Sequence, residues 1–270
     1  MKDIRVAIAQ VPAILGNKER NIGKIREIAG EVREYDLLIF PELFLTGYNI
    51  RNEVFRLAEP IDGKSVKEVS EIAENNGIHI IFGMPERDGD AVYNSAVLVE
   101  PDGKIHRYRK IMLPNFGPFE EGLYYTAGKE LPVFDTALGK IAIEICYDLF
   151  YPEISKAFAG KGAEIIVNIS GSPSISRALF ERLLPARAIE TGTYFLYSNN
   201  IGTQLGLVFW GGSRAISPKG EIISKGEAYE EGIVTAELSA DYLRVIRENR
   251  PIYRDSRPEI MEEMLRSWSH

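Results

Sequence analysis

Short apolar runs, rich in isoleucine and valine, alternate along this chain with segments whose apolar residues recur at helical spacing. The runs Ile4–Gln10 and Asp36–Phe40 have the length and β-branched content of buried strands. A helical pattern lies between them and continues to about Glu34, with Asn17 placed to cap its start. Runs that are apolar on both faces need cover on both sides, so this alternation predicts sheets with helices packed against them.

The same pattern continues to the end of the chain, with tight turns marking two hairpins at Pro101–Lys104 and Pro218–Gly220. The further predicted strands are Ile78–Gly83, Tyr93–Val99, Ile105–Arg109, Val133–Thr136, Lys140–Cys146, Glu164–Asn168, Tyr194–Ser198, Gly212–Ser217, Glu221–Ser224 and Gly232–Glu237. The further predicted helices are Ser65–Asn76, Ile154–Ala159, Arg177–Thr191 and the arginine-rich tail from Ala240. The segment Pro114–Gly128 is rich in glycine, proline and aromatic residues, which is typical of a functional loop. Because no linker interrupts the pattern, we expect one domain over residues 1–270, built from two mixed sheets packed face to face with helices outside.

Composition excludes several classes of protein. The formal net charge of −7 argues against a nucleic-acid or anionic-membrane surface. No apolar run approaches the roughly 18 residues that a membrane span needs, and the N-terminus leads directly into a strand pattern, so no signal peptide is expected. A single cysteine allows no internal disulfide, and together these features favour the cytoplasm. The scarcity of glutamine and cysteine beside many charged residues indicates a thermophilic source.

Three predicted strands end in reactive side chains. Glu42 follows Asp36–Phe40, Lys110 follows Ile105–Arg109, and the only cysteine, Cys146, ends the run that begins at Lys140. A cysteine nucleophile needs a base to accept its proton and positive charge to stabilise the oxyanion, and these residues supply both. Each residue also has a structural interpretation: a small buried hydrophobe for Cys146, a loop acid for Glu42 and one cation of a basic cluster for Lys110. Their coincidence at strand ends favours the catalytic interpretation.

The sequence lacks the residue patterns that other common catalytic and binding sites need. The three histidines, His79, His106 and His270, do not have metal-ligand spacing, so we expect no metal site and no Cys–His dyad. The chain has no G-x-S-x-G, Walker or G-x-G-x-x-G motif.

Several blocks along the chain resemble the nitrilase (carbon–nitrogen hydrolase) superfamily. The blocks are Phe40–Leu43 with Thr46–Tyr48, Tyr108–Lys110 with Leu113–Pro114, Phe119–Glu121, Cys146–Asp148 with Pro152–Glu153, Ala186–Glu190, Asn199–Gly202, and Gly212–Ser213 with Pro218–Gly220. The resemblance implies a four-layer αββα sandwich that commonly dimerises into an αββα–αββα assembly, and an enzyme without metal or cofactor. It also implies a catalytic triad of Glu42, Lys110 and Cys146. A second glutamate contributes in many members, and Glu121 matches it best, with its neighbour Glu120 as the alternative.

The resemblance also implies a mechanism. Glu42 would take the thiol proton and Cys146 would attack the carbon of an amide to give a thioester. Lys110 and the backbone N–H of Tyr147 would hold the oxyanion. Glu42, with Glu121 helping to position a water, would then release the acid.

Residues around the motifs bear on the substrate. Tyr147 and Asp148 after the cysteine resemble amidase branches more than true nitrilases, while Asn168–Pro173 resembles the glutaminase domains of glutamine-dependent NAD synthetases. Those domains usually carry an acidic residue directly after the cysteine, where this chain has Tyr147. The candidate substrate-binding residues are Tyr48, Phe116, Phe119, Ser172 and Arg177, and the Arg177 cation is suited to a substrate carboxylate, although it is equally consistent with a solvated helix N-terminus.

We therefore expect a cytoplasmic amidase that acts on small linear amides, with nitrile hydrolysis as the runner-up. A subunit that supplies ammonia to a partner protein is the alternative from another class. The helical tail, residues 240–270, is expected at the contact of a homodimer.

Overall fold

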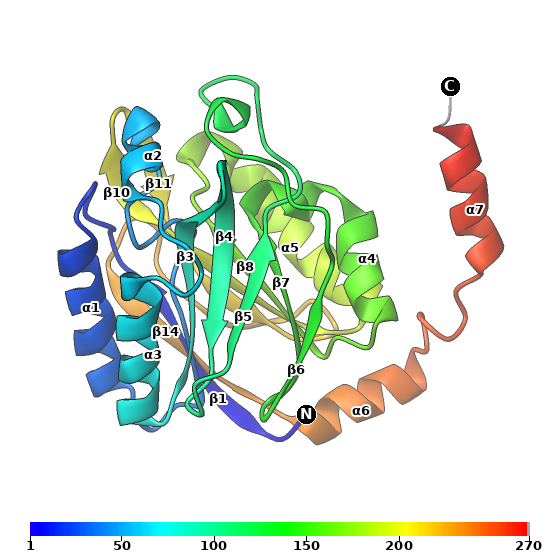
Figure 1. Ribbon diagram of the computed structural model, residues 1–270. Helices are drawn as coiled ribbons and strands as arrows, with labels where there is room; N and C mark the ends of the chain where they lie inside the picture. The colour runs from blue at the N-terminus through cyan, green and yellow to red at the C-terminus, as the bar shows by residue number, and fades with distance from the viewer. Residues whose placement is uncertain (269–270) are drawn as a thin grey trace.

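The computed structural model describes residues 1–268, which form two six-stranded sheets (Figure 1). The first sheet has the strand order β14–β1–β2–β3–β4–β5. Its strands are β1 (Ile4–Gln10), β2 (Leu37–Ile39), β3 (His79–Asp88), β4 (Ala91–Val99), β5 (Ile105–Arg109) and β14 (Gly232–Leu238). The three strands β1, β2 and β3 run parallel, whereas β14, β4 and β5 pair antiparallel with their neighbours.

The second sheet repeats this plan with the order β13–β12–β9–β8–β7–β6. Its strands are β6 (Val133–Thr136), β7 (Gly139–Ile145), β8 (Ile165–Ser170), β9 (Tyr194–Asn199), β12 (Arg214–Ile216) and β13 (Ile222–Lys225). Its central strands β7, β8 and β9 are parallel, and the remaining pairs are antiparallel. The two mixed sheets predicted from the sequence are therefore present.

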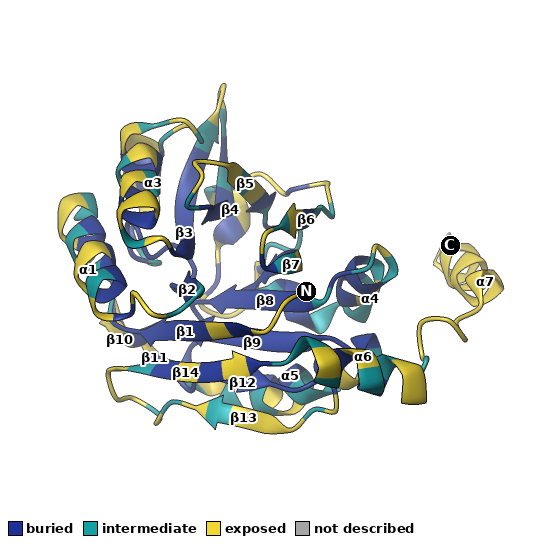
Figure 2. Cartoon of the chain, turned by 90° about the horizontal axis from the view of Figure 1, so that it is seen from below, coloured by how far each residue is buried: buried dark blue, intermediate teal, exposed yellow. Residues whose placement is uncertain are grey.

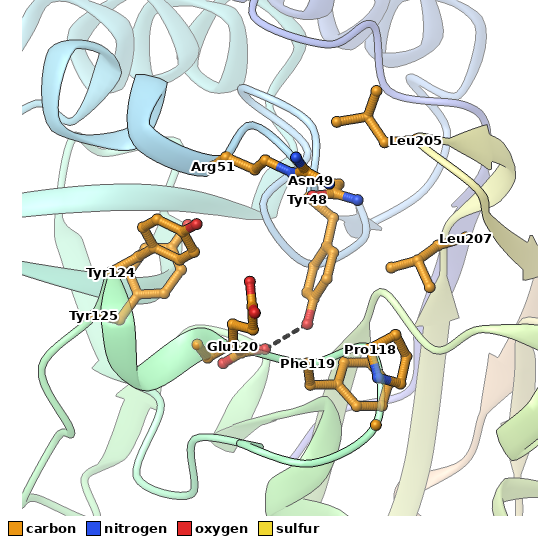
Figure 3. A pocket seen from close by; sticks show the side chains of 12 residues that line it. Tyr48, Asn49, Arg51, Pro118, Phe119, Glu120, Tyr124, Tyr125, Leu205 and Leu207 are labelled. Carbon is orange, nitrogen blue, oxygen red and sulfur yellow. Dashed lines mark hydrogen bonds between the residues drawn. The ribbon is translucent and has the colours of Figure 1, made fainter.

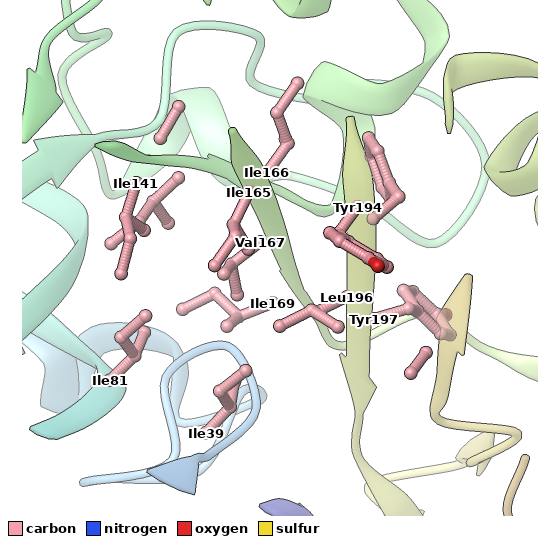
Figure 4. Packing of buried hydrophobic residues seen from close by; sticks show 14 of the residues in the cluster. Ile39, Ile81, Ile141, Ile165, Ile166, Val167, Ile169, Tyr194, Leu196 and Tyr197 are labelled. Atoms are coloured by element: carbon pink, nitrogen blue, oxygen red, sulfur yellow. The ribbon is translucent and has the colours of Figure 1, made fainter. Parts of the chain in front are cut away.

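Alternating side chains of the strands divide the core into layers. Val6 of β1 belongs to the cluster that joins the two sheets, whereas its neighbour Ala7 faces the helices that cover the first sheet. Figure 4 shows the layer between the sheets, where Ile81 of the first sheet faces residues such as Ile165 of the second. Most of these side chains are fully buried, so burial of apolar surface holds the two sheets together.

Helices cover the outer faces of both sheets (Figures 1 and 2). The first sheet is covered by α1 (Lys18–Glu31) and α3 (Lys64–Asn76), and the second by α4 (Pro152–Gly160) and α5 (Arg177–Thr191). Asn17 caps α1 as predicted, since its side chain accepts a hydrogen bond from the backbone N–H of Arg20. Gly77 ends α3 in the left-handed conformation, with φ of 64°. The layered αββα sandwich is confirmed.

Several short elements were not predicted. They are η1 (Arg51–Glu53), α2 (Val54–Leu57), η2 (Glu121–Leu123), η3 (Cys146–Phe150), η4 (Ser174–Ser176) and the hairpin of β10 (Ile201–Gln204) and β11 (Leu207–Trp210). None is longer than five residues, so no hydrophobic period has room to develop. The strand predicted from Gly212 begins two residues later, because Gly211 and Gly212 have positive φ angles of 67° and 64° and form a turn instead.

The tail is helical as predicted, with α6 (Ala240–Asn249) and α7 (Pro258–Ser267). Leu243 and Ile246 bury α6 against the body, but α7 has no buried residue and lies away from the sandwich (Figures 1 and 2). His270 lies outside the described residues. No helix within residues 1–268 combines the length and apolarity needed to cross a bilayer.

The other two histidines have structural contacts. His79 is buried, and its Nε2 lies 3.3 Å from Glu100, while Nε2 of His106 lies 2.7 Å from the same carboxylate. Both histidines therefore have a structural partner in Glu100.

We predict that Gly83→Ala lowers the free energy of unfolding by at least about 2 kcal/mol, because the added methyl group meets rigid backbone. A β-carbon at Gly83 would overlap the backbone of Leu43 and lie 2.8 Å from the Cα atom of Glu42. The matched control is Gly23→Ala in α1, where no atom lies within 4 Å and the free energy should rise by up to about 1 kcal/mol. Urea denaturation measures both, and equal stabilities of the two variants would contradict the packing.

Candidate active site

Glu42 lies in the loop that follows β2, and its side chain is completely buried. One carboxylate oxygen, Oε1, accepts hydrogen bonds of 2.7 Å from Asn94 Nδ2 and from Lys110 Nζ. The other, Oε2, accepts one of 2.6 Å from the backbone N–H of Gly171. Two strands of the first sheet and one loop of the second thus hold this carboxylate in place.

Lys110 is also completely buried, directly after β5. Its ammonium donates hydrogen bonds of 2.7 Å to Glu42 and 2.7 Å to Glu121, so it is held between two carboxylates. Burial lowers the pKa of Lys110, but the charges of Glu121 and Glu42 outweigh burial and raise this pKa well above its ordinary value. The lysine is therefore a fixed positive charge at neutral pH.

Glu121, and not its neighbour Glu120, joins this buried cluster. Oε1 of Glu121 accepts hydrogen bonds from Lys110 and, at 2.7 Å, from the hydroxyl of Tyr48, whereas its buried Oε2 has no partner among the described residues. Burial raises the pKa of Glu121 to about 7. Glu120 is exposed to solvent. The structure thus brings Glu121, and not Glu120, to Lys110, and its catalytic role stays a prediction.

Cys146 is the first residue of η3, where the chain turns sharply away from the end of β7. Its φ of 48° is unusual for a residue with a β-carbon and costs about 1–3 kcal/mol, which the surrounding contacts must offset. Burial and the negative charge of Glu42 raise the pKa of the thiol well above its ordinary value, while Lys110 opposes this rise. Cys146 is therefore a protonated thiol at neutral pH, within the electrostatic reach of both partners.

Asp148 fixes the turn of the cysteine against the loop of the lysine. One of its oxygens accepts from the backbone N–H of Ile145 at 3.0 Å and from the hydroxyl of Tyr108 at 2.8 Å. The other accepts from the backbone N–H of Met112 at 2.8 Å. Since Tyr108 and Met112 flank Lys110, this buried carboxylate couples the position of the thiol in the second sheet to that of the lysine in the first.

A cavity of about 290 Å³ opens to solvent (Figure 3), and of this cluster Glu121 lines it, whereas Glu42, Lys110 and Cys146 are not among its lining residues. Its inner wall includes Glu121, Phe119 and Tyr48, two of which were predicted to bind substrate. In Figure 3, Tyr124 and Tyr125 form one side, and Leu205 and Leu207 of the β10–β11 hairpin form the other. Tyr48 and Glu121, which are joined by a hydrogen bond of 2.7 Å, both line this cavity.

The other predicted binding residues do not line this cavity. Phe116 is about half exposed, and its ring packs against Tyr147 at a centroid distance of 5.3 Å. Ser172 is fully buried, and its backbone N–H donates to Asn199 Oδ1 at 2.8 Å. Arg177 begins α5 and pairs with Glu181 at 3.1 Å, which matches its structural interpretation. The roles of these residues, and of the Tyr147 N–H, remain predictions.

Sequence reasoning missed several residues of the site. Asn94 is a polar residue in the apolar run of the buried strand β4, and such a residue can indicate a functional site. Gly171 contributes only a backbone N–H, which leaves no side-chain signal. Arg51 and Tyr124 line the cavity from short, irregular segments whose approach depends on the tertiary fold.

A sandwich of two mixed sheets with a buried cysteine, lysine and glutamate at its strand ends is the arrangement of a thiol-dependent hydrolase. The carbon–nitrogen hydrolase family profile matches residues 5–248, and the chain belongs to this family, within the nitrilase superfamily. The protein is therefore a hydrolase of this superfamily, as its sequence motifs predicted.

Similar proteins carry several functional names. The chain is 34% identical over 264 residues to a nitrilase of Pyrococcus abyssi, covering 95% of this chain and 98% of the relative. It is 31% identical over 279 residues to the omega-amidase NIT2 of Danio rerio, covering 96% and 97%. It is also 36% identical over 248 residues to the glutamine-dependent NAD(+) synthetase of Thermotoga maritima, covering 89% of this chain but only 43% of that longer protein.

Among solved structures, the chain resembles the amidase from Nesterenkonia sp. AN1, with a TM-score of 0.84 and 27% identity over 97% of this chain and 99% of that one. That structure shows the result of Michael addition of acrylamide at the active site cysteine. The fold and the superfamily are therefore shown, whereas the names of the relatives leave the substrate open.

We predict that charge removal at the two ends of the Glu42–Lys110 pair shifts the pKa of Cys146 in opposite directions. Because the Glu42 charge raises this pKa, Glu42→Gln should move the alkylation of Cys146 by iodoacetamide to lower pH. Because the Lys110 charge lowers it, Lys110→Met should move alkylation to higher pH. The readout is the rate of alkylation against pH.

The control for this experiment is Lys140→Met, which removes a lysine at the far end of β7 and should leave the profile unchanged. Shifts in the same direction for both site variants, or no shift, would contradict the arrangement of charges around the thiol.

Proposed function

We propose that the protein is an amidase that releases ammonia from small linear amides through a thioester on Cys146. The observation that carries the proposal is the buried ammonium of Lys110, 2.7 Å from both Glu42 and Glu121 and beside the only thiol of the chain. Such a cluster supplies a nucleophile, a base and a fixed positive charge in a site from which water is largely excluded.

The reaction begins with the protonated thiol. Glu42 accepts the thiol proton as the sulfur attacks the amide carbon, so the free thiolate never has to exist in the empty, buried site. The negative charge that develops on the carbonyl oxygen is stabilised by Lys110 and by the backbone N–H of Tyr147. Glu42 then transfers the proton to the nitrogen, the carbon–nitrogen bond breaks, and ammonia leaves.

Hydrolysis of the thioester completes the cycle. A water molecule gives a proton to Glu42 and attacks the thioester carbon. The carbon–sulfur bond then breaks to release the acid, and Glu42 returns the proton to the sulfur to restore the thiol. The unpartnered Oε2 of Glu121 supports its role as acceptor for this water or for the amide N–H, since the rest of that carboxylate is held by Lys110 and Tyr48. No step requires a cofactor.

The size and lining of the cavity support a short acyl group with a polar end. A cavity of about 290 Å³ accommodates only a small molecule. Arg51 is the cation among the described residues that line it, whereas Arg177 is paired with Glu181. A carboxylate at the distal end of the substrate would therefore find Arg51 at the cavity wall, as in an ω-amide of a dicarboxylic acid.

Nitrile hydrolysis is the second candidate, because a relative with 34% identity is named a nitrilase. Attack on a nitrile gives a thioimidate in place of the tetrahedral amide adduct, with the same nucleophile. Tyr147 after the cysteine favours the amide, since a Trp-Glu pair commonly follows it in true nitrilases. The third candidate function is that of a subunit that supplies ammonia to a partner protein. It is supported by the similarity to a glutamine-dependent synthetase, which is longer than the region that matches this chain.

The experiment that separates these functions is an ammonia-release assay of the purified protein on a panel of short amides, ω-amides and nitriles. We predict turnover of amides by the wild type and a loss of at least about 10³-fold in Cys146→Ala, because the nucleophile is removed. The thermal unfolding midpoint of the variant serves as the control for folding.

The outcomes discriminate the candidates. Turnover of nitriles without amides would replace the proposal with a nitrilase, and activity that appears only with a copurified protein would favour the subunit. Equal ammonia release by Cys146→Ala and wild type would overturn the thiol mechanism.

We further propose that residues 1–270 form one domain in a cytoplasmic homodimer whose subunits meet through the tail. The exposed apolar side chains Ile260, Met261 and Met264 of α7 support a contact with a second copy, because an isolated helix of ten residues is marginal in water.

We predict that the double substitution Ile260→Asp and Met264→Asp weakens the dimer by at least about tenfold in Kd, because it places two charges in the contact. Sedimentation equilibrium measures the change. The control is Glu262→Gln on the same helix, which should leave the mass unchanged. A monomeric wild type would contradict the proposed assembly.

A further inference from the structure

A row of polar side chains crosses the second sheet beneath its covering helices. Glu144 of β7 lies in register with Asn168 of the adjacent strand β8, and both are completely buried. Ser155 of α4 contacts Glu144, so this row faces the helices and not the other sheet. A carboxylate is costly in such a place, and the mechanism proposed above does not use it.

Hydrogen bonds satisfy both oxygens of Glu144. Oε2 accepts from the hydroxyl of Ser155 at 2.7 Å, and Oε1 accepts from Asn168 Nδ2 at 3.0 Å. Burial raises the pKa of Glu144 to about 7, and the charge of Arg187 opposes this rise only weakly. Among residues 1–268, the partners of this carboxyl group are thus neutral donors, and no cation forms a direct ion pair with it.

Asn168 connects this carboxylate to the nucleophile. Its Nδ2 also donates to the backbone carbonyl of Cys146 at 3.4 Å, and its Oδ1 accepts from the hydroxyl of Ser170 at 2.7 Å. The Ser170 side chain also lies close enough to the Cys146 thiol to lower its pKa. Asn168 therefore contacts the cysteine turn directly, through the backbone carbonyl of Cys146, and also holds Ser170, a neighbour of the thiol.

We propose that Glu144 and Asn168 are positioning residues that hold Cys146 in its reactive conformation, an inference that rests on the proposed function only for its effect on turnover. The conformation needs such support because the φ of Cys146, 48°, is strained. The carbonyl of Cys146 fixes the orientation of the peptide that carries the Tyr147 N–H, the predicted oxyanion donor. A hydrogen bond to this carbonyl therefore acts on the nucleophile and the oxyanion site together.

Glu144 is required to orient Asn168, because the side-chain amide of an asparagine can rotate by about 180° and exchange the places of its oxygen and its amino group. With an acceptor at Glu144 Oε1, the amino group of Asn168 must face Glu144 and the Cys146 carbonyl, and its oxygen must face Ser170. An apolar residue at this position would leave both orientations open. If Glu144 only filled space between the sheet and its helices, leucine would fill it as well, because leucine has a similar volume and loses no favourable hydration on burial.

The test compares Glu144→Leu, Glu144→Gln and Asn168→Ala with the control Ser155→Ala, which removes the other hydrogen bond to Glu144 and leaves the link to Asn168. The rate of alkylation of Cys146 by iodoacetamide is measured for each variant, with the unfolding midpoint, and kcat and KM for ammonia release. Alkylation needs no substrate, so it tests the positioning role even if no amide or nitrile is turned over.

We expect alkylation and kcat to fall on the order of tenfold or more in Glu144→Leu and Asn168→Ala, with KM within about threefold, because misplacement of the nucleophile acts on the chemical step. Glu144→Gln keeps an acceptor for Asn168 and should stay within about threefold of the wild type, as should Ser155→Ala. If Asn168→Ala does not fold, the leucine and glutamine variants decide the question.

Two results would overturn the inference. One is alkylation in Glu144→Leu at the rate of Ser155→Ala. The other is a loss of alkylation that follows the unfolding midpoint across all four variants, since this would show a structural role alone.

Discussion

The buried ammonium of Lys110, shared between two carboxylates, is the interaction on which the rest of the site depends. Each of these charges alone would be destabilising by several kcal/mol in a buried site. In the cluster, Lys110 donates to Glu42 and to Glu121. Asn94, the Gly171 N–H and the Tyr48 hydroxyl also donate to these two carboxylates, so among the described residues three of their four oxygens have partners and one does not. The exception, the buried Oε2, belongs to Glu121, which lines the cavity, and in the proposed mechanism a reacting water or amide would become its partner.

The fold supplies this arrangement because its two sheets meet face to face. Glu42 and Lys110 follow strands of the first sheet, whereas Cys146 follows a strand of the second. No single sheet holds all three groups, so the apolar layer between the sheets sets the distance of the thiol from the carboxylate and the ammonium. Asp148 reinforces that layer at the site, since it belongs to the cysteine turn and accepts hydrogen bonds from both sides of Lys110.

The sequence alone predicted the strands that carry the site, because long apolar runs have few alternative structures. The same strand ends placed Glu42, Lys110 and Cys146 together as candidates. It favoured Glu121 over Glu120 through the family resemblance and kept Glu120 as the alternative, since adjacent residues of an irregular loop share their local signals and only the fold turns one inward. It also missed Arg51, whose approach to the cavity depends on a short 3-10 segment. Backbone donors such as Gly171 leave no trace in residue type.

The strained turn at Cys146 explains why the site extends beyond the residues that touch substrate. A residue with φ of 48° relaxes toward ordinary backbone unless several contacts oppose the relaxation. Asp148 opposes it from the side of the first sheet, and Asn168 opposes it from the helix side. The turn that carries the thiol thus lies between two buried carboxyl groups, Asp148 and Glu144, neither of which transfers a proton in the mechanism that we propose. Their burial costs stability, and in the proposed mechanism the compensation is a nucleophile that is already oriented when the substrate arrives, so that less of the binding energy is needed to align it.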